Sequence, residues 1–435
     1  MRSRMWRRLG ATESLFYFYS AQHGAIRDDR LCSITLTRGS DVPVGLSNNL
    51  LSVKVRGALD SVGTDNTEAY LVLTDYAMGL LSPRIGAGPG GINAAPMSAR
   101  WSGRIAGQTV TDTGTGREPV WSTEIAGTDW LSLLPALEGK ATMTKTGDTQ
   151  LLAMYRSLLA NTGLRLASLD ARGSLFHHLR WISTDPASKD FDSSTVLGHF
   201  LADLGYLMRT RRDSIPQVIS TDYQASRQAG WKVWCPLPLQ RSQCLAPVSW
   251  SQPVTLPRRL QYLNRDTANE NVTYTSTITV GTPSTKLASW PTEVLDFRDV
   301  YVYGSLTDAM VARASRAASD RYIVRSVRVD VLALFESPDL ADRQQLAQLL
   351  LLDAGDPITL GYDWPVYVRR VYFASRITET ITPDGWTLDI DLTPGNHITG
   401  QHSPADLAGT TWDTAYPAGT TWDTPPASKT WSTAP

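Results

Sequence analysis

Apolar and polar residues alternate along much of the chain, and this pattern predicts a protein built mainly of β-strands. The alternation begins after Leu31, and residues 70–73 add a short apolar run that is typical of a buried strand. β-type patterns return from Arg258 in residues 260–263 and in the Thr-rich stretch 272–280. The inward positions expected in the first strands are Ile34, Leu36, Leu51, Val53 and Val55.

Residues 100–134 contain one sequence motif twice, first at 101–107 and again at 121–127. In each copy a Trp and an Ile stand four residues apart, so a strand places both on one face. The polar link between the copies predicts a long hairpin loop. Arg104 and Glu124 then occupy matching places on the opposite face, where we expect a cross-strand charge pair.

Residues 141–257 change character, because helical periodicity alternates there with short strands. Residues 148–160 predict one helix, and Ser-Ser-Thr at 193–195 predicts the cap of a second. The apolar face of the second helix is expected at Leu197, Phe200, Leu201 and Leu204. His177, His178 and His199 also fall here; neighbouring strand residues point to opposite faces, so we interpret them as surface or packing histidines rather than metal ligands.

Capping residues and composition predict further elements. Thr128 and Asp129 offer an N-cap for a short apolar helix at 130–134. Further elements expected along the chain are an alanine-rich helix at 306–319, a strand at 322–331 with Val327, Val329 and Val331 on one face, and a helix that starts at Ser-Pro-Asp 337–339.

The clearest element is the hairpin of residues 376–392, in which two alternating strands flank the turn Pro383-Asp384-Gly385. Asp389 and Asp391 lie on the face of this hairpin that is expected to be wet. We therefore interpret them as solvated acids rather than as a catalytic carboxylate pair.

This hairpin has the form I-T-P-x-G-W-T-x-x-L-x-L, which stands here as residues 381–392, and a strand entered through Gly355-Asp356-Pro357 precedes it. Together with the unit at 100–134, these features resemble the minor tail proteins of long-tailed bacteriophages. More narrowly, they resemble the baseplate hub, or tail-tip, proteins of phages that infect actinobacteria. The resemblance covers most of residues 31–396 in the order of elements, and it implies two similar β domains per chain.

The expected fold class is α+β, mainly β, with two hub-type β domains, an α/β middle domain and an extended C-terminal tail. The predicted boundaries are 1–140 for the N-terminal hub domain with its basic arm, 141–257 for the middle domain, 258–400 for the second hub domain and 401–435 for the tail. We interpret the four arginines of residues 1–8 either as an exposed arm or as the product of an early start codon, with Met5 as the alternative start.

Composition narrows the function classes. The 435 residues carry 41 basic and 42 acidic side chains, which gives a formal net charge of -1. The protein therefore has no strong positive electrostatic field that would favour binding of nucleic acid. No run of 18 apolar residues predicts a membrane span. Three cysteines without metal-ligand spacing fit synthesis in a reducing cytoplasm. The balance of 14 Trp against 8 Phe favours an assembly component, because Trp is enriched at interfaces.

The last residues repeat a Trp-Asp-Thr phrase at 408–414 and 418–424, with a degenerate copy at 429–433. Such a short Pro- and Thr-rich segment cannot bury its three tryptophans by itself. One interpretation is a solvated low-complexity tail. The other is a docking strap in which Trp412, Trp422 and Trp431 fill pockets on a partner while the Thr-rich flanks add an edge strand.

No catalytic motif, cofactor loop or metal-ligand spacing is recognisable. Residues 86–91 match the letters G-x-G-x-x-G, but Pro89 removes an amide and no helical period follows, so we predict a plain loop. We therefore expect no enzyme, no cofactor and no metal. A tail-associated wall hydrolase is the least favoured class.

The resemblance implies a structural hub of the virion that is made in the host cytoplasm and forms a homotrimer. Its implied neighbours are the distal tail protein, the tape-measure protein, and tail-tip or fibre proteins. The alternative is a receptor-binding tail protein whose exposed Trp and Tyr side chains contact cell-wall glycans.

Overall fold

The protein is represented by a computed structural model that describes residues 4–394 with short breaks and several longer gaps. The longer gaps are 81–98, 161–167, 170–177, 182–187, 221–236, 253–257, 266–272, 281–290 and 304–321. Residues 395–435 lie outside the description, and so do the predicted helix at 306–319, the glycine loop at 86–91 and His177.

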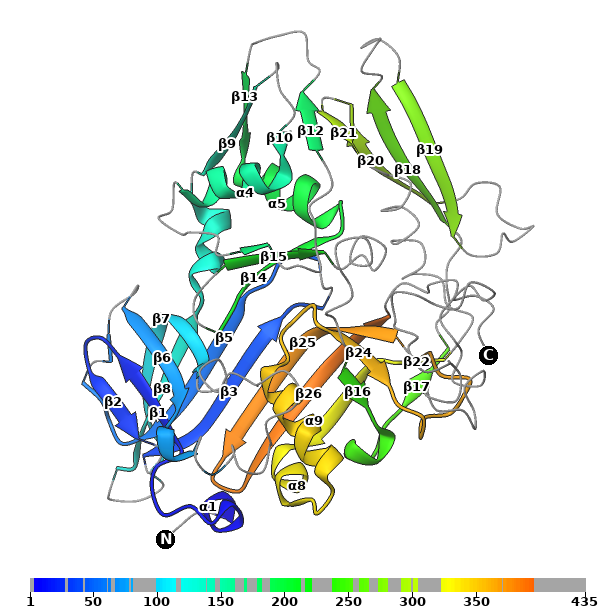
Figure 1. The fold of residues 1–435 in the computed structure, drawn as a ribbon. Helices are drawn as coiled ribbons and strands as arrows, with labels where there is room; N and C mark the ends of the chain where they lie inside the picture. The colour runs from blue at the N-terminus through cyan, green and yellow to red at the C-terminus, as the bar shows by residue number, and fades with distance from the viewer. Residues whose placement is uncertain are drawn as a thin grey trace, which may run out of the picture.

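A curled twelve-stranded sheet dominates the described residues and forms the lower body in Figure 1. The fold is therefore mainly β, as the alternation predicts. From one edge the order of the strands is β16 (Leu237–Leu239), β24 (Pro357–Leu360), β25 (Val371–Thr382), β3 (Leu31–Gly39), β5 (Asn49–Arg56), β8 (Trp121–Thr128), β7 (Ala99–Asp112), β6 (Glu68–Leu73), β1 (Phe16–Ser20) and β2 (Gly24–Arg27). Two further strands lie off this path: β26 (Gly385–Pro394) pairs with β25, and β23 (Ser326–Asp330) pairs with β26.

The predicted inward positions form the main core. Leu51, Val53 and Val55 alternate with more exposed neighbours along β5 and are at most 3% exposed. Ile34 and Leu36 on β3 are equally buried. Burying alternate side chains of each strand removes apolar surface from water, which is the main favourable term in forming such a sheet.

The first and last parts of the chain meet inside this one sheet. β25 pairs β3 in antiparallel fashion, with Thr378 opposite Thr37 and Ile381 opposite Ile34. The two predicted hub domains therefore share a hydrogen-bonded seam in the structure, while their limits as separate domains stay a prediction.

The middle of the chain builds smaller sheets above the large one (Figure 1). The predicted helix is confirmed as α4 (Leu151–Ala160), with Met154, Tyr155, Leu158 and Leu159 buried. The small sheets contain β9 (Lys140–Thr144) with β13 (Ser188–Asp192); β10 (Thr149–Gln150), β12 (His178–Trp181) and β21 (Val300–Tyr303); and β11 (Ser168–Leu169), β15 (Pro216–Ser220), β14 (Tyr206–Thr210) and β4 (Gly45–Leu46).

Three strands of the predicted last domain form a sheet whose core residues pack against this middle part. They are β18 (Arg258–Arg265), β19 (Thr273–Val280) and β20 (Thr292–Phe297). Leu260, Tyr262 and Phe297 belong to the same buried cluster as Tyr155 of α4 and Phe200.

The second middle helix, α5 (Ser193–Leu197), is capped differently from the prediction. Asp192 is the N-cap and its carboxylate accepts a hydrogen bond from the Thr195 amide at 2.7 Å. The three hydroxyl residues therefore lie inside the helix, since a carboxylate is also a favoured cap and completes the electrostatic match at the N-terminus. A single π turn, η2 (Gly198–Ala202), continues the helix and buries Phe200 and Leu201 as expected.

The repeated phrase forms the predicted hairpin of β7 and β8, but in another register. Arg104 lies opposite Thr128, and Glu124 lies opposite Thr109, so the expected Arg104–Glu124 pair is wrong. The reason is that β7 continues to Asp112, whose carboxylate accepts hydrogen bonds from the amides of Gly114 and Val120 and closes a shorter loop. Trp101 is buried, whereas Trp121 lies beyond the core and is 43% exposed.

Two other boundaries differ from the prediction. The strand expected to include Val331 ends at Asp330, because that carboxylate accepts from the amides of Leu332 and Ala333 and starts α8 (Val331–Glu336). Residues of the expected exposed arm form α1 (Arg4–Leu9), which buries Met5 and Leu9. Its Arg8 pairs with Glu336 at 2.6 Å.

Caps and turns confirm the other local predictions. Asp129 caps the 3-10 helix η1 (Trp130–Ala136), and Ser337 precedes α9 (Leu340–Leu351), accepting from the Asp339 amide at 3.2 Å. The final hairpin is formed by β25 and β26, with Thr382 opposite Gly385 across a turn of Pro383 and Asp384. Within the described residues, no helix has both the length and the apolar character needed to cross a membrane.

Candidate functional site: a buried ion-pair cluster and exposed apolar surfaces

Among the residues that the structure describes, a cluster of buried charges surrounds Glu379 on β25. Its carboxylate is completely buried and accepts hydrogen bonds from Arg100 on β7, with Nη2 to Oε2 at 2.5 Å and Nε to Oε1 at 3.2 Å. Arg38 on β3 donates to Oε2 at 3.3 Å, and Trp386 on β26 donates its indole N–H to Oε1 at 2.9 Å. Two distant strands, β3 and β7, therefore converge with the β25–β26 hairpin on one carboxylate.

The sequence contains a signal for this site that the initial interpretation missed. Glu379 lies between Ile377 and Ile381 in the alternation of β25, so it must share their inward face. A buried carboxylate requires charged or hydrogen-bonding partners. Alternation therefore identifies Glu379 as a buried acid, but it does not identify which arginines face it.

The cluster continues to the loop that follows α9. Asp353 lies 3.2 Å from Nε of Arg38 and 3.3 Å from Nε of Arg212. Arg212 also donates to the carbonyl oxygens of Leu350 and Leu352. These carbonyls belong to the end of a helix, where the backbone has no intrahelical donor, so the arginine satisfies them and complements the helix dipole.

A further arginine of the middle segment completes the connection. Arg209 on β14 donates to the Ala354 carbonyl at 2.5 Å and to Asp356 at 2.9 Å, while Nε donates to Gln217. Asp356 in turn accepts from the Asp353 amide at 2.8 Å. The Gly-Asp-Pro turn named in the sequence is thereby held against β14.

The charges in this cluster stabilise one another. Burial by itself would raise the pKa of Glu379, but the guanidinium groups of Arg100 and Arg38 outweigh it and lower that pKa to about 2. Asp353 is affected in the same way, since Arg212 and Arg38 overcome its burial and lower its pKa to about 2. Burial, aided by the like charges of Arg100 and Arg38, lowers the pKa of Arg212 to about 9.

Both acids are therefore ionised at neutral pH, which does not suit proton transfer. A general acid or base works best with a pKa near the operating pH and must reach its substrate. Glu379 has neither property, and its partners Arg100, Arg38 and Trp386 lie within the protein. The cluster connects segments rather than performing chemistry.

Asp129 is the buried acid whose pKa does lie near neutrality. Its burial raises the pKa to about 6, opposed mainly by a hydrogen bond from the Asn49 amide. Its oxygens are occupied, because Oδ2 accepts from Asn49 N at 2.9 Å and Oδ1 accepts from Ser132 N at 3.1 Å. Asp129 thus serves as a helix cap that also fixes the start of β5.

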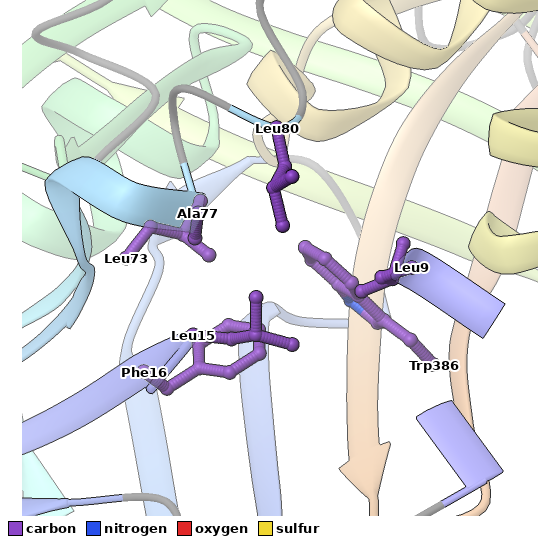
Figure 2. A pocket seen from close by; sticks show the side chains of 7 residues that line it. All are labelled: Leu9, Leu15, Phe16, Leu73, Ala77, Leu80 and Trp386. Atoms are coloured by element: carbon purple, nitrogen blue, oxygen red, sulfur yellow. The ribbon is translucent and has the colours of Figure 1, made fainter. Parts of the chain in front are cut away.

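A small pocket beside the cluster is lined only by apolar side chains (Figure 2). Figure 2 shows Trp386 next to Leu9, with Phe16 facing them across the pocket; the Phe16 and Trp386 rings meet edge to face at 5.2 Å. The other lining residues are Leu15, Leu73, Ala77 and Leu80. With no polar group, the pocket has nothing to orient a reacting molecule.

The outer face of the final hairpin carries Asp389 and Asp391, as predicted for solvated acids. Asp389 pairs with Arg328 at 2.5 Å, and Asp391 pairs with Arg376 at 2.6 Å. Arg376 also reaches Asp41 at 2.7 Å. No group of three metal-ligating side chains occurs among the residues that the structure describes.

Two groups of exposed apolar side chains stand out in the described part of the chain. The first, here called the tyrosine surface, consists of Tyr322, Tyr362, Val366 and Tyr367, whose exposed fractions are 39%, 71%, 64% and 50%. Tyr322 and Tyr367 meet edge to face at 5.4 Å. The second, the hairpin-tip surface, consists of Val110, Val120 and Trp121 at the end of β7 and β8.

The predicted docking residues Trp412, Trp422 and Trp431 lie outside the described residues. Their role is not tested by the geometry and stays a prediction.

Comparisons with known proteins relate the fold to phage tails. No family model matches the sequence, and no curated protein matches it significantly. Among solved structures, the 43 kDa tail protein of prophage MuSo2 from Shewanella oneidensis superposes with a TM-score of 0.51 at 6% identity, covering 88% of this chain and 98% of that chain. At this identity the match shows a shared fold.

A second structure is a type VI secretion system component of E. coli, described as structurally similar to the T4 bacteriophage tail proteins gp27 and gp5. It matches with a TM-score of 0.40 at 12% identity, covering 85% of this chain and 74% of that chain.

Proposed function

We propose that this chain is a structural component of a phage tail tip, acting as a baseplate hub that joins the tail tube and distal tail ring to the tip and its fibres. The observation that carries the proposal is the fold shared with a prophage tail protein over almost the whole length of that protein. The sequence motifs at residues 100–134 and 381–392, which resemble those of phage minor tail proteins, independently support the same class of protein.

The interior of the protein supports a structural role. The acids of the buried cluster are ionised and enclosed by arginines from distant segments, which suits a rigid body that transmits load. Breaking a buried ion pair is strongly unfavourable, so such a cluster resists separation of the segments it joins. The described cavity near it is apolar and small.

The proposed assembly is a homotrimer. Two similar β regions per chain would let three chains offer six near-equivalent surfaces to a six-fold tail tube. The proposed neighbours are the distal tail protein, the tape-measure protein, and tip or fibre proteins. In this assembly the tail of residues 401–435 acts as the strap, with Trp412, Trp422 and Trp431 as anchors on a partner.

Native mass measurement and electron microscopy of the purified chain test the proposal. We expect a species of three chains that appears as a closed ring with a central opening. A compact monomer at every concentration, with no ring in the images, would contradict the hub.

A receptor-binding tail protein is the second candidate, favoured by the exposure of Tyr362 and Tyr367. Exposed aromatic rings can stack on sugars, so this function predicts saturable binding of cell-wall glycan fragments by the isolated protein. Loss of that binding in Tyr362→Ala, without loss of ring formation, would favour it over a purely structural hub.

A further inference from the structure

Hydrogen bonds and a buried tryptophan anchor the loop that carries Tyr362, Val366 and Tyr367 of the tyrosine surface. Trp364, two residues after Tyr362, is buried and donates its indole N–H to the Leu239 carbonyl at 2.9 Å. Asp363 accepts from the amides of Arg241 and Ser242 at 2.6 and 2.8 Å. The exposed side chains are therefore presented by an ordered loop, which lowers the entropy lost when something binds them.

The C-terminal tail leaves the body close to this surface. Pro394, the last described residue, is paired with Tyr372, which is five residues beyond Tyr367. Leu392 donates its amide to the Arg325 carbonyl at 2.7 Å, three residues after Tyr322. From these connections the tail starts on the order of 20 Å or less from Tyr322.

The tail is long enough for Trp412 to reach this surface. Trp412 follows Pro394 by 18 residues. An unrestrained linker of that length has a root-mean-square span of about 23 Å. The effective concentration of a tethered group is greatest when the linker span equals the distance to the site. Trp431 is 37 residues beyond Pro394, so its effective concentration is about threefold lower.

The chemistry of the two partners is complementary. The tail supplies a tryptophan followed by an aspartate in each full repeat, Trp412-Asp413 and Trp422-Asp423. The surface supplies exposed tyrosine rings and Val366, with exposed Arg325 next to the strand from which the tail departs. Tryptophan packs well on tyrosine rings, and an arginine is the natural counter-charge for the following aspartate.

We propose that residues 408–424 dock on the tyrosine surface of the same chain, with Trp412 as the main anchor. The inference goes beyond the proposed function, which assigns the tail to a partner in the assembled particle. Before assembly the surface holds the tail, and the partner later displaces it. The hairpin-tip surface is a poor alternative, because β7 lies far along the sheet from β24, as Figure 1 also shows.

Site-specific photocrosslinking in the full-length chain tests the proposal. A photoreactive phenylalanine replaces Tyr362 in one protein and Val120, which is 55% exposed on the hairpin tip, in the matched control. We expect crosslinks from position 362 to peptides of residues 395–435 and none from position 120. Trp412→Ala should lower the yield about fivefold, and Trp431→Ala less than twofold.

Three results would overturn the proposal. They are equal tail crosslinking from position 120, a yield at position 362 that Trp412→Ala with Trp422→Ala leaves unchanged, and crosslinks that join only different copies when isotopically labelled and unlabelled chains are mixed. Competition of the crosslink by glycan fragments but not by a peptide of residues 408–424 would also overturn it, in favour of glycan binding.

The outcome is separable from that of the proposed function. Rings that assemble without any tail crosslink would refute the docking and leave the hub intact. A tail that crosslinks at position 362 in a chain that never forms rings would do the opposite.

Discussion

Glu379 illustrates how one buried residue depends on the whole fold. Its carboxylate faces Arg100 and Arg38 in an environment without solvent, so each charge is tolerated only because the others are present. Alternation in β25 is enough to place Glu379 inside the protein, whereas its arginine partners come from strands that are hundreds of residues away along the chain.

Replacing this carboxylate should be costly. We expect Glu379→Gln to lower the free energy of unfolding by about 3–5 kcal/mol, because two buried guanidinium groups lose their counter-charge. Asp389→Asn on the outer face of the same hairpin is the control, and its exposed pair with Arg328 predicts a loss of at most about 1 kcal/mol. Denaturant unfolding measures both; equal losses would show that the buried cluster contributes little.

Asp129 should give the stability a distinct pH dependence. Its pKa is raised to about 6 in the folded protein, above about 3.9 in an unfolded chain, so the folded state binds the proton more tightly. Its contribution is therefore greatest below about pH 4 and is lost as the pH rises through 6, by up to about 3 kcal/mol in total. Glu379 and Asp353 act oppositely, since their lowered pKa values give stability that is lost as the pH falls from about 4 towards 2.

Unfolding of the wild type and of Asp129→Asn at pH 4, 5, 6 and 7 isolates this dependence. The wild type should lose stability relative to the variant as the pH rises from 4 through 6, and the loss should be nearly complete at pH 7. Asp112→Asn, at an exposed turn, is the control. A constant difference between wild type and Asp129→Asn would refute the assignment.

At the scale of elements, the pairing of β3 with β25 depends on a close approach of their backbones at Gly39. Gly39 ends β3 with φ +96°, and a Cβ there would lie 2.0 Å from the Ser375 carbonyl oxygen. Only glycine permits this conformation and this contact. The same seam unites the first and last parts of the chain.

Gly39→Ala should therefore destabilise the protein by more than about 2 kcal/mol, from strain and from displacement of β25. Gly107→Ala in β7 is matched as another strand glycine, but nothing lies within 4 Å of its added Cβ, so a change of at most about 0.5 kcal/mol is expected. Thermal unfolding compares the two. Similar midpoints would show that the seam relaxes without penalty.

At the scale of the whole molecule, the body and the tail should be separable. The described core ends at Pro394, and the buried clusters contain no residue beyond it. We expect truncation before Ser403 to leave the unfolding transition within about 0.5 kcal/mol of wild type, because no described core contact is removed. The same truncation should weaken tail assembly or fibre attachment.

Circular dichroism melting and counts of infectious particles measure these two effects. A matched variant that keeps the full length but carries Trp412→Ala, Trp422→Ala and Trp431→Ala separates the tryptophans from the chain length. Normal, infectious tails from both variants would contradict the strap.

The sequence by itself determined the local elements of this protein. Alternation located the inward faces of β3, β5, β25 and β26, and caps such as Asp129 located helix starts, because these signals act over only a few neighbouring residues. The relation to phage tail proteins also rested on short phrases of this kind, and the fold match agrees with it.

Only the tertiary structure decided the register of β7 and β8, the seam between β3 and β25, and the partners of Glu379. The local pattern was the same for either hairpin register, and an Asp112 turn with a bulge between Ile105 and Gly107 selected one. Arg100 and Glu379 are 279 residues apart, and their pairing depends on how separate segments pack. That packing is a property of the assembled sheet, and no short stretch of sequence contains it.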